Sequence, residues 1–427
     1  MSAEPSEKPT THRVQFDPAA YAGKLPGEFR FFENRDKPFY RAASKVVASI
    51  FGPPGALDDE TVRIWGESYY RADPVAERFV AEVYLTRGQD AGRALVDRAL
   101  EHGVDAIPDA PASLRALFEE IETVPSWVDW ARVEEGARVF RRFGRDLFSF
   151  AGAITLHGYR ESSVAKPLVF TGAYAGKTAL NRFLETASFW IDVAAPGGLR
   201  PRGVGVRTAL RVRLMHVFVR AGLLSHPQWD LDAWGVPISQ GDALLTLMGG
   251  SFIPGYGLRL LGYLTTRDEI EALLHFWRYV GHLMGVQPPW YPANVGEAAA
   301  LMWASEVKSC NRSGDDGRHL VQSYVEAFEP KGGSLAEWLE YGRELAFVSW
   351  FVPPWTRAQF GVPSAGPFHL YHFARAPFIA GRELLRRASP AFAEYEDARV
   401  QAESLAWVTS KLGTRHAEYK AVEKFTR

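Results

Sequence analysis

Cysteine is almost absent from this chain of 427 residues, which contains only Cys310. A single thiol forms neither an internal disulfide nor a zinc–thiolate cluster, and it is typical of proteins from a reducing compartment. An excess of charge of one sign is also lacking, since 49 basic and 50 acidic residues give a net charge of -1. We therefore expect a cytoplasmic protein that binds no nucleic acid.

Long apolar runs are missing as well. No segment reaches the ~18 to 20 uninterrupted apolar residues that a transmembrane helix needs, and "LAFVSWFVPPW" ends in two prolines. The start, "MSAEPSEKPTTHRVQF", is polar and does not resemble a secretory signal. We expect a flexible tail over 1–25 and no transmembrane segment, with peripheral membrane contact left open.

Helical periodicity dominates what is present. Apolar residues recur at three- and four-residue steps, and no alternating strand pattern joined by tight turns occurs. The sequence therefore predicts an all-α fold, with one large domain over 26–427. Beyond the first hundred residues, the predicted helical stretches are 113–122, 130–158, 177–194, 206–224, 241–248, 267–285, 296–308, 317–328, 335–350 and 376–411.

Several common catalytic motifs do not occur. The chain has no Gly-x-Ser-x-Gly elbow, no complete Gly-x-x-x-x-Gly-Lys-Ser/Thr phosphate-binding loop, and no HExxH zinc motif. His275 and His282 are seven residues apart on one predicted helix face, and their apolar neighbours favour core histidines over a metal pair.

His216 stands out within the apolar segment "RVRLMHVFVR". On a helix, its face is an apolar strip edged by Arg213 and Arg220. A haem needs an apolar surface, an imidazole for its iron and arginines for its propionates, and this face carries all three. The alternative is a core histidine bonded to a carbonyl, with both arginines solvated or paired to carboxylates.

A second polar line lies on the preceding predicted helix, in "KTALNRFLETASFWIDVA". Arg182 and Thr186 are four residues apart on one face, which Phe189 continues as an apolar surface. This pattern is compatible with a cation and a hydroxyl that look into an apolar cavity. The alternative is a local ion pair of Arg182 with Glu185, with Thr186 bonded to a backbone carbonyl.

The ordered motifs resemble a known family. The runs "RFLETASFWIDVAAPGGLRPRGVGVRTALRVRLMHVFVR", "WGVPISQGDALLTLMGGSF" and "FWRYVGHLMGV", with "VPSWVDWARVEEGARVFRRFG" upstream, are similar to oxygenases that include the latex-clearing proteins (rubber oxygenases) and the MpaB-type oxygenases. The likeness is clear over roughly 120–290 and looser to about 390.

This resemblance implies a haem b protein with a globin-like helical core, in which His216 is the proximal iron ligand. It also implies that Arg182 and Thr186 line the distal side, where dioxygen is the co-substrate. The latex-clearing members cleave carbon–carbon double bonds of polyisoprene. This chain departs from them at Glu185, where they carry a lysine, and resembles the non-secreted branch more closely. Glu185 is then expected to orient Arg182 or to accept a proton.

We expect an apolar, unsaturated substrate such as a terpenoid or lipid. Phe189 and the small residues of "FTGAYAG" leave apolar space, and no cationic clamp remains for phosphate or carboxylate. In this interpretation Arg182, Thr186 and Glu185 are catalytic, while His216, Arg213, Arg220 and Phe189 bind the cofactor. The alternative functions are a haem-based oxygen or redox sensor and a haem-free helical binding protein.

Overall fold

Helices form the regular structure of the computed structural model, which describes residues 16–172 and 177–413. No β-strand occurs within these ranges, so the predicted all-α class is confirmed. The first fifteen residues of the predicted tail lie outside the described residues. Its remainder contains a 3₁₀ helix, Pro18–Tyr21, whose Tyr21 ring stacks on Tyr70 at 4.4 Å between ring centroids. None of the described helices is both long and apolar enough to cross a bilayer.

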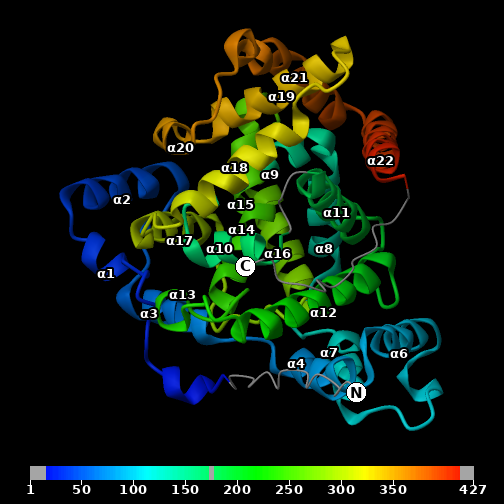
Figure 1. The fold of residues 1–427 in the computed structure, drawn as a ribbon. Coiled ribbons are helices and arrows are strands. Elements are labelled where there is room, and N and C mark those ends of the chain that lie inside the picture. Colours follow the sequence, from blue (N-terminus) through cyan, green and yellow to red (C-terminus); the bar gives the residue numbers. More distant parts are fainter. Residues whose placement is uncertain (1–15, 173–176, 414–427) are drawn as a thin grey trace, which may run out of the picture.

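The helices lie in three tiers (Figure 1). The lower tier holds α4 (Pro74–Phe79), α5 (Leu85–Arg87), α6 (Gln89–His102) and α7 (Ala112–Glu122). The middle tier holds α8 (Trp130–Arg142), α9 (Gly144–Gly158), α10 (Ser162–Phe170), α11 (Lys177–Val193), α12 (Val204–Leu224), α14 (Gln240–Gly250), α15 (Phe252–Gly257) and α16 (Arg267–Leu283). The upper tier holds α19 (Leu335–Phe351), α21 (Tyr371–Ala388) and α22 (Pro390–Leu412).

Shorter or peripheral helices complete the fold. They are α1 (Phe31–Asn34), α2 (Pro38–Phe51), α3 (Asp59–Glu67), α13 (Leu231–Trp234), α17 (Val295–Lys308), α18 (Gly314–Phe328) and α20 (Pro354–Phe360). The buried hydrophobic side chains form one large cluster that runs from Phe29 to Val408, with a small satellite around Leu345.

Two predicted helices are each divided in the structure. The stretch 130–158 breaks between α8 and α9 at Gly144, whose φ of 53° lies in the left-handed region that glycine adopts most easily. The stretch 376–411 belongs to α21 and α22, which meet at Ser389. There the Ser389 side chain caps α22 and Pro390 occupies its first turn, where a proline is tolerated because that N–H has no helical partner.

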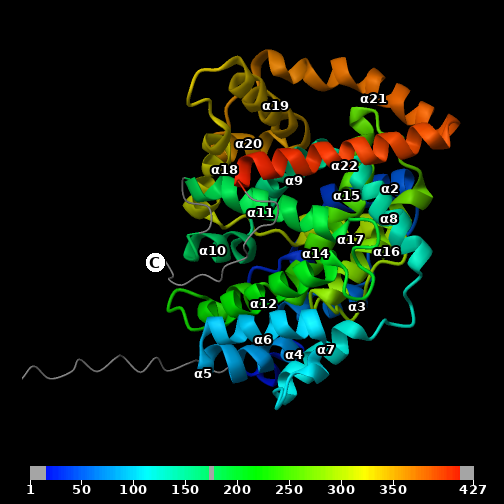
Figure 2. The ribbon, with the colours of Figure 1, turned by 90° about the vertical axis from the view of Figure 1, so that its right-hand side faces the viewer.

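The hairpin of α11 and α12 is closed by glycines. A Cβ atom on Gly205 would lie 2.7 Å from the Cα of Val193, so only glycine permits this close approach of the two helices. Beside this contact, the Thr208 hydroxyl donates a hydrogen bond of 2.7 Å to the buried carboxylate of Asp192. Figure 2 shows α12 between the lower-tier helices and α11. The start of α12 is thereby fixed against the end of α11.

We expect Gly205→Ala to lower the free energy of unfolding by about 1–3 kcal/mol, because the new methyl group meets backbone atoms of α11. Gly249→Ala in α14 is the matched control, since its Cβ would meet no atom within 4 Å. That change should stabilise the protein by about 0.5–1 kcal/mol through the helix preference of alanine. Urea unfolding of both variants measures the difference, and equal effects would contradict the close-approach argument.

Candidate functional site

His216 lies half-buried in the middle of α12. Burial first, and then the positive charge of Arg220, lower the pKa of its imidazole to about 4. The ring is therefore neutral at pH 7. No hydrogen bond or ion pair joins this ring to another residue in the part of the chain that the structure describes. A neutral imidazole of this kind has a nitrogen lone pair available for a metal.

Arg213 and Arg220 are held by groups of the chain itself. The Arg213 guanidinium is almost fully buried and donates two hydrogen bonds, of 2.7 and 2.8 Å, to the carboxylate of Asp73. Its Nη2 also lies 2.7 Å from a carboxylate oxygen of Glu120. Asp73 directly precedes α4 and Glu120 lies in α7, so both carboxylates come from the lower-tier segment of the chain. Arg213 thus ties α12 to that tier, and its role toward a cofactor stays a prediction.

Arg220 is engaged in the same way. It donates to the backbone carbonyls of Pro237 and Ile238 at 2.9 and 2.7 Å, and it pairs with Glu77 at 3.1 Å. The predicted alternative, arginines paired to carboxylates, therefore describes both side chains as they stand. Contact with a propionate would require an exchange of these partners.

The polar line on α11 consists of local contacts. Arg182 donates to Glu185 at 2.9 Å, and the Thr186 hydroxyl donates to the Arg182 carbonyl at 3.1 Å. These are the contacts that the sequence offered as the alternative to a distal oxygen site. Burial raises the pKa of Glu185, and the positive charge of Arg182 opposes this shift. A raised pKa favours the predicted role of Glu185 as a proton acceptor, which itself stays a prediction.

The hairpin places this line and His216 at the same level. Counting eight residues back from Asp192 on α11 reaches Leu184, and counting eight forward from Thr208 on α12 reaches His216. Eight residues of helix rise about 12 Å in either case. Arg182, Glu185 and Thr186 thus lie about as far along α11 from this contact as His216 lies along α12. Thr186 is exposed at this level, whereas Phe189 is buried in the core.

The remaining predictions concern the segment before α11 and the histidine pair. Residues 173–176 of "FTGAYAG" lie outside the described residues. His275 accepts a hydrogen bond of 3.0 Å from the backbone N–H of Asp129, as expected of a core histidine, whereas the buried Nε2 of His282 has no hydrogen-bond partner among the described residues. Within the described ranges, no group of three or more His, Cys, Asp or Glu side chains could hold a metal ion.

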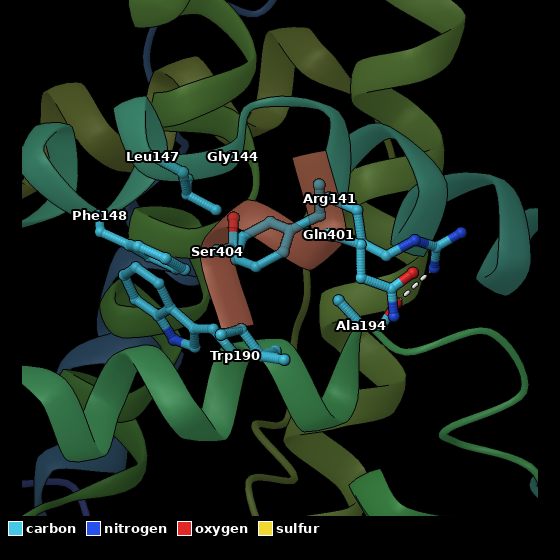
Figure 3. A pocket seen from close by; sticks show the side chains of 10 residues that line it. Arg141, Gly144, Leu147, Phe148, Trp190, Ala194, Gln401 and Ser404 are labelled. Atoms are coloured by element: carbon cyan, nitrogen blue, oxygen red, sulfur yellow. Dashed lines mark hydrogen bonds between the residues drawn. The ribbon is translucent and has the colours of Figure 1, made fainter. Parts of the chain in front are cut away.

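A narrow cleft of about 30 Å³ opens beside the second half of α11. Figure 3 shows Leu147, Phe148 and Trp190 on one side of it and Arg141 and Gln401 on the other. Arg141 donates a hydrogen bond to the carbonyl of Ala194. The full lining is Phe140, Arg141, Gly144, Leu147, Phe148, Trp190, Ile191, Ala194, Gln401 and Ser404.

None of the predicted site residues lines this cleft. Trp190 nevertheless follows Thr186 by one turn on α11, so the cleft begins about 6 Å further along the helix. No sequence pattern indicates this cleft, because its walls come from α8, α9, α11 and α22, and only the tertiary packing brings these helices together.

Known proteins share this architecture. A family model described as "ER-bound oxygenase mpaB/B'/Rubber oxygenase, catalytic domain" matches residues 140–381. The rubber oxygenase of Streptomyces sp. (strain K30) is 29% identical over 265 residues, which are 59% of this chain and 60% of that protein. The match thus spans less than two thirds of that relative.

A solved structure of latex clearing protein in the closed state has the same fold. It superposes with a TM-score of 0.55 at 20% sequence identity, covering 83% of this chain and 94% of that one. The family model covers more than half of the chain, including all of α11, α12 and α16. The chain therefore belongs to the MpaB and rubber oxygenase catalytic-domain family.

Proposed function

We propose that this protein is a haem b-dependent oxygenase that uses dioxygen on an apolar, unsaturated substrate. The observation that carries the proposal is the neutral imidazole of His216, which has no partner among the described residues. Membership of an oxygenase family supports the reaction class. The name of the rubber oxygenase relative supports oxidative attack on an apolar carbon chain.

The chemistry of the His216 environment fits a haem ligand. A core histidine without a cofactor is expected to bond through its ring, since buried polar groups usually find partners. The lowered pKa keeps the ring unprotonated, which iron ligation requires. Buried apolar neighbours on the same face, Val212, Val219 and Leu223, suit a flat apolar macrocycle. When bound, haem would supply the iron chemistry that activates dioxygen.

The chain's own residues would orient the reacting groups. Arg182 lies about as far along α11 from the Asp192–Thr208 contact as His216 lies along α12. Glu185 holds that guanidinium at 2.9 Å, so it would fix the direction of the Arg182 N–H groups. Burial raises its pKa, so it would hold a proton more readily than an exposed carboxylate does. Thr186 would contribute its hydroxyl as a further donor once it exchanges the Arg182 carbonyl for another acceptor.

The cleft beside Trp190 is our candidate for part of the apolar substrate site. Its walls are mainly aromatic and aliphatic, and it adjoins the turn after Thr186. Burial of apolar surface at about 25 cal/mol per Å² could hold a hydrocarbon there without a charged contact. Oxidative cleavage of a carbon–carbon double bond, as in latex-clearing proteins, is the reaction that we propose.

Arg213 and Arg220 would serve the cofactor through α12. Both anchor the helix that carries His216, one on each side of it in the sequence. Because their guanidinium groups are committed to carboxylates and carbonyls, we propose that they position His216 and that direct contact with a propionate is secondary.

His216→Ala should abolish haem binding, because no other described group replaces the imidazole. The purified variant is expected to lack the Soret band while keeping wild-type helicity by circular dichroism, and added imidazole should restore part of the band. His102→Ala, on the exposed end of α6, is the control. A full haem complement in the His216 variant would contradict the assignment. A wild-type protein without haem would favour a haem-free binding protein.

Arg182→Ala should keep haem but lose turnover by about a hundredfold, the usual cost of one preorganised donor. The assay is oxygen uptake with alkene-containing lipids, with small organic acids tested separately. Asn181→Ala, exposed on the same helix, is the matched control. If the Arg182 variant unfolds or keeps full activity, the Arg182–Glu185 pair is structural only. Uptake driven only by the acids would contradict the apolar substrate.

Arg213→Ala should lower the free energy of unfolding by about 3–5 kcal/mol even without haem, because it leaves Asp73 buried without its cation. Arg211→Ala breaks an exposed pair with Asp97 and should change stability by less than about 1 kcal/mol. Thermal unfolding of the haem-free variants makes the comparison. A stable Arg213 variant that fails only to bind haem would assign the arginine to a propionate.

A further inference from the structure

Helix α21 turns its apolar side to solvent. Phe373, Phe378, Leu384 and Leu385 are 61%, 76%, 57% and 55% exposed. At 100° per residue they fall within an arc of about 140°, and the other residues of that arc are alanine, glycine and proline. Leu370, just before the helix, is 63% exposed and continues the strip. We call this set of side chains the α21 strip.

The charged side of α21 faces the protein. Arg375 makes two hydrogen bonds, of 2.9 and 3.0 Å, with the buried carboxylate of Asp146. Arg386 pairs with Asp397 at 2.6 Å. Glu383 is 4% exposed and lies 3.5 Å from Arg142. This arrangement is the reverse of an ordinary surface helix, which buries its apolar stripe.

The buried ion pairs fix the helix in this orientation. Rotation of α21 to bury the strip would pull three charged side chains away from their partners, and an unpaired buried charge is strongly destabilising. Figures 1 and 2 both show α21 along the top edge of the molecule, with no described helix outside it. The strip is thus a permanent feature of the surface, of the kind that marks an interaction site.

Charges at the edges of the strip indicate what covers it. Arg382 lies about 40° beyond Phe378, and Arg387 lies about 40° beyond Phe373 on the other edge. Both side chains are exposed; Arg382 also pairs with the Glu396 carboxylate on α22, and Arg387 donates to the Leu264 carbonyl without a carboxylate partner among the described residues. The single acidic residue of α21, Glu383, is buried. An apolar strip with arginines on both margins complements a bilayer surface with anionic headgroups.

Aromatic residues next to α21 extend the same surface. The ring of Trp350 packs on that of Phe373, with 4.7 Å between the ring centroids, and Trp355 in α20 is 64% exposed. Tryptophan is enriched where a protein meets the boundary between lipid tails and water. The 18 residues of α21 span about 27 Å, which is long enough to lie flat in that boundary layer.

We propose that the α21 strip binds peripherally to a lipid bilayer that contains anionic headgroups. The helix lies in the plane of the interface with Phe378 and Leu385 among the acyl chains, while Arg382 and Arg387 contact the headgroups. This inference rests on the geometry of α21 alone and does not depend on the proposed cofactor or reaction. It would hold the protein where apolar molecules are dissolved.

The test uses the full chain with vesicles of phosphatidylcholine, alone or mixed with phosphatidylglycerol, in a sedimentation assay. We expect the protein to bind the mixed vesicles and the double variant Phe378→Asp, Leu385→Asp to bind at least about tenfold more weakly. The matched control is Phe39→Asp, Ile50→Asp, on α2, whose side chains are 71% and 63% exposed. Arg387→Gln should reduce the preference for the anionic vesicles, as should high salt.

Three results would overturn the proposal. The first is a wild-type protein that binds neither kind of vesicle. The second is an equal loss of binding in the α2 control. The third is a dimer in light scattering that the α21 variant converts to a monomer, which would make the strip an interface between copies. Circular dichroism and the melting temperature show whether each variant is folded, which we expect because all five substituted side chains are exposed.

Discussion

The close crossing of α11 and α12 is the constraint on which the candidate site depends. Because Gly205 has no Cβ atom, its backbone can pack directly against the backbone of α11 at Val193. The Asp192–Thr208 hydrogen bond fixes the register of the two helices. His216 and the turn that carries Arg182 then lie at about equal distances from this contact, one along α12 and the other along α11. A one-residue slip would rotate each side chain by 100° and would separate the two halves of the site.

Buried arginines hold the helices in this arrangement through ion pairs with carboxylates of other segments. Arg213 and Arg220 join α12 to carboxylates that precede or belong to the lower tier, while Arg375 and Arg343 converge on Asp146 beneath the upper tier. Such pairs add little net stability but are costly to break, so they specify one arrangement of the helices. Buried ion pairs therefore hold α12 in place and also hold α21 with its apolar side outward.

Much of the fold could be predicted from the sequence, because helical periodicity is a pattern among residues close together in the chain. Three- and four-residue apolar spacing located most of the long helices from 113 onward but missed α10, α13, α15 and α20. Caps such as Thr266, which forms a capping box with Glu269, mark helix ends. The two divided helices were missed because a single glycine at 144 and the Ser389–Pro390 pair interrupt otherwise continuous periodicity. His216 was singled out for the conflict between its polarity and its neighbours, and Arg182 and Thr186 for their spacing.

The sequence by itself determined the all-α class, the family likeness and the polar residues that interrupt apolar faces, since each is a property of neighbours along the chain. Only the tertiary structure decided which partners those residues have. Asp73 and Arg213 are 140 positions apart, and no local pattern links them. Periodicity likewise shows that α21 has an apolar and a charged side. Which side faces water depends on Asp146 and Asp397, because a buried charge must follow its partner.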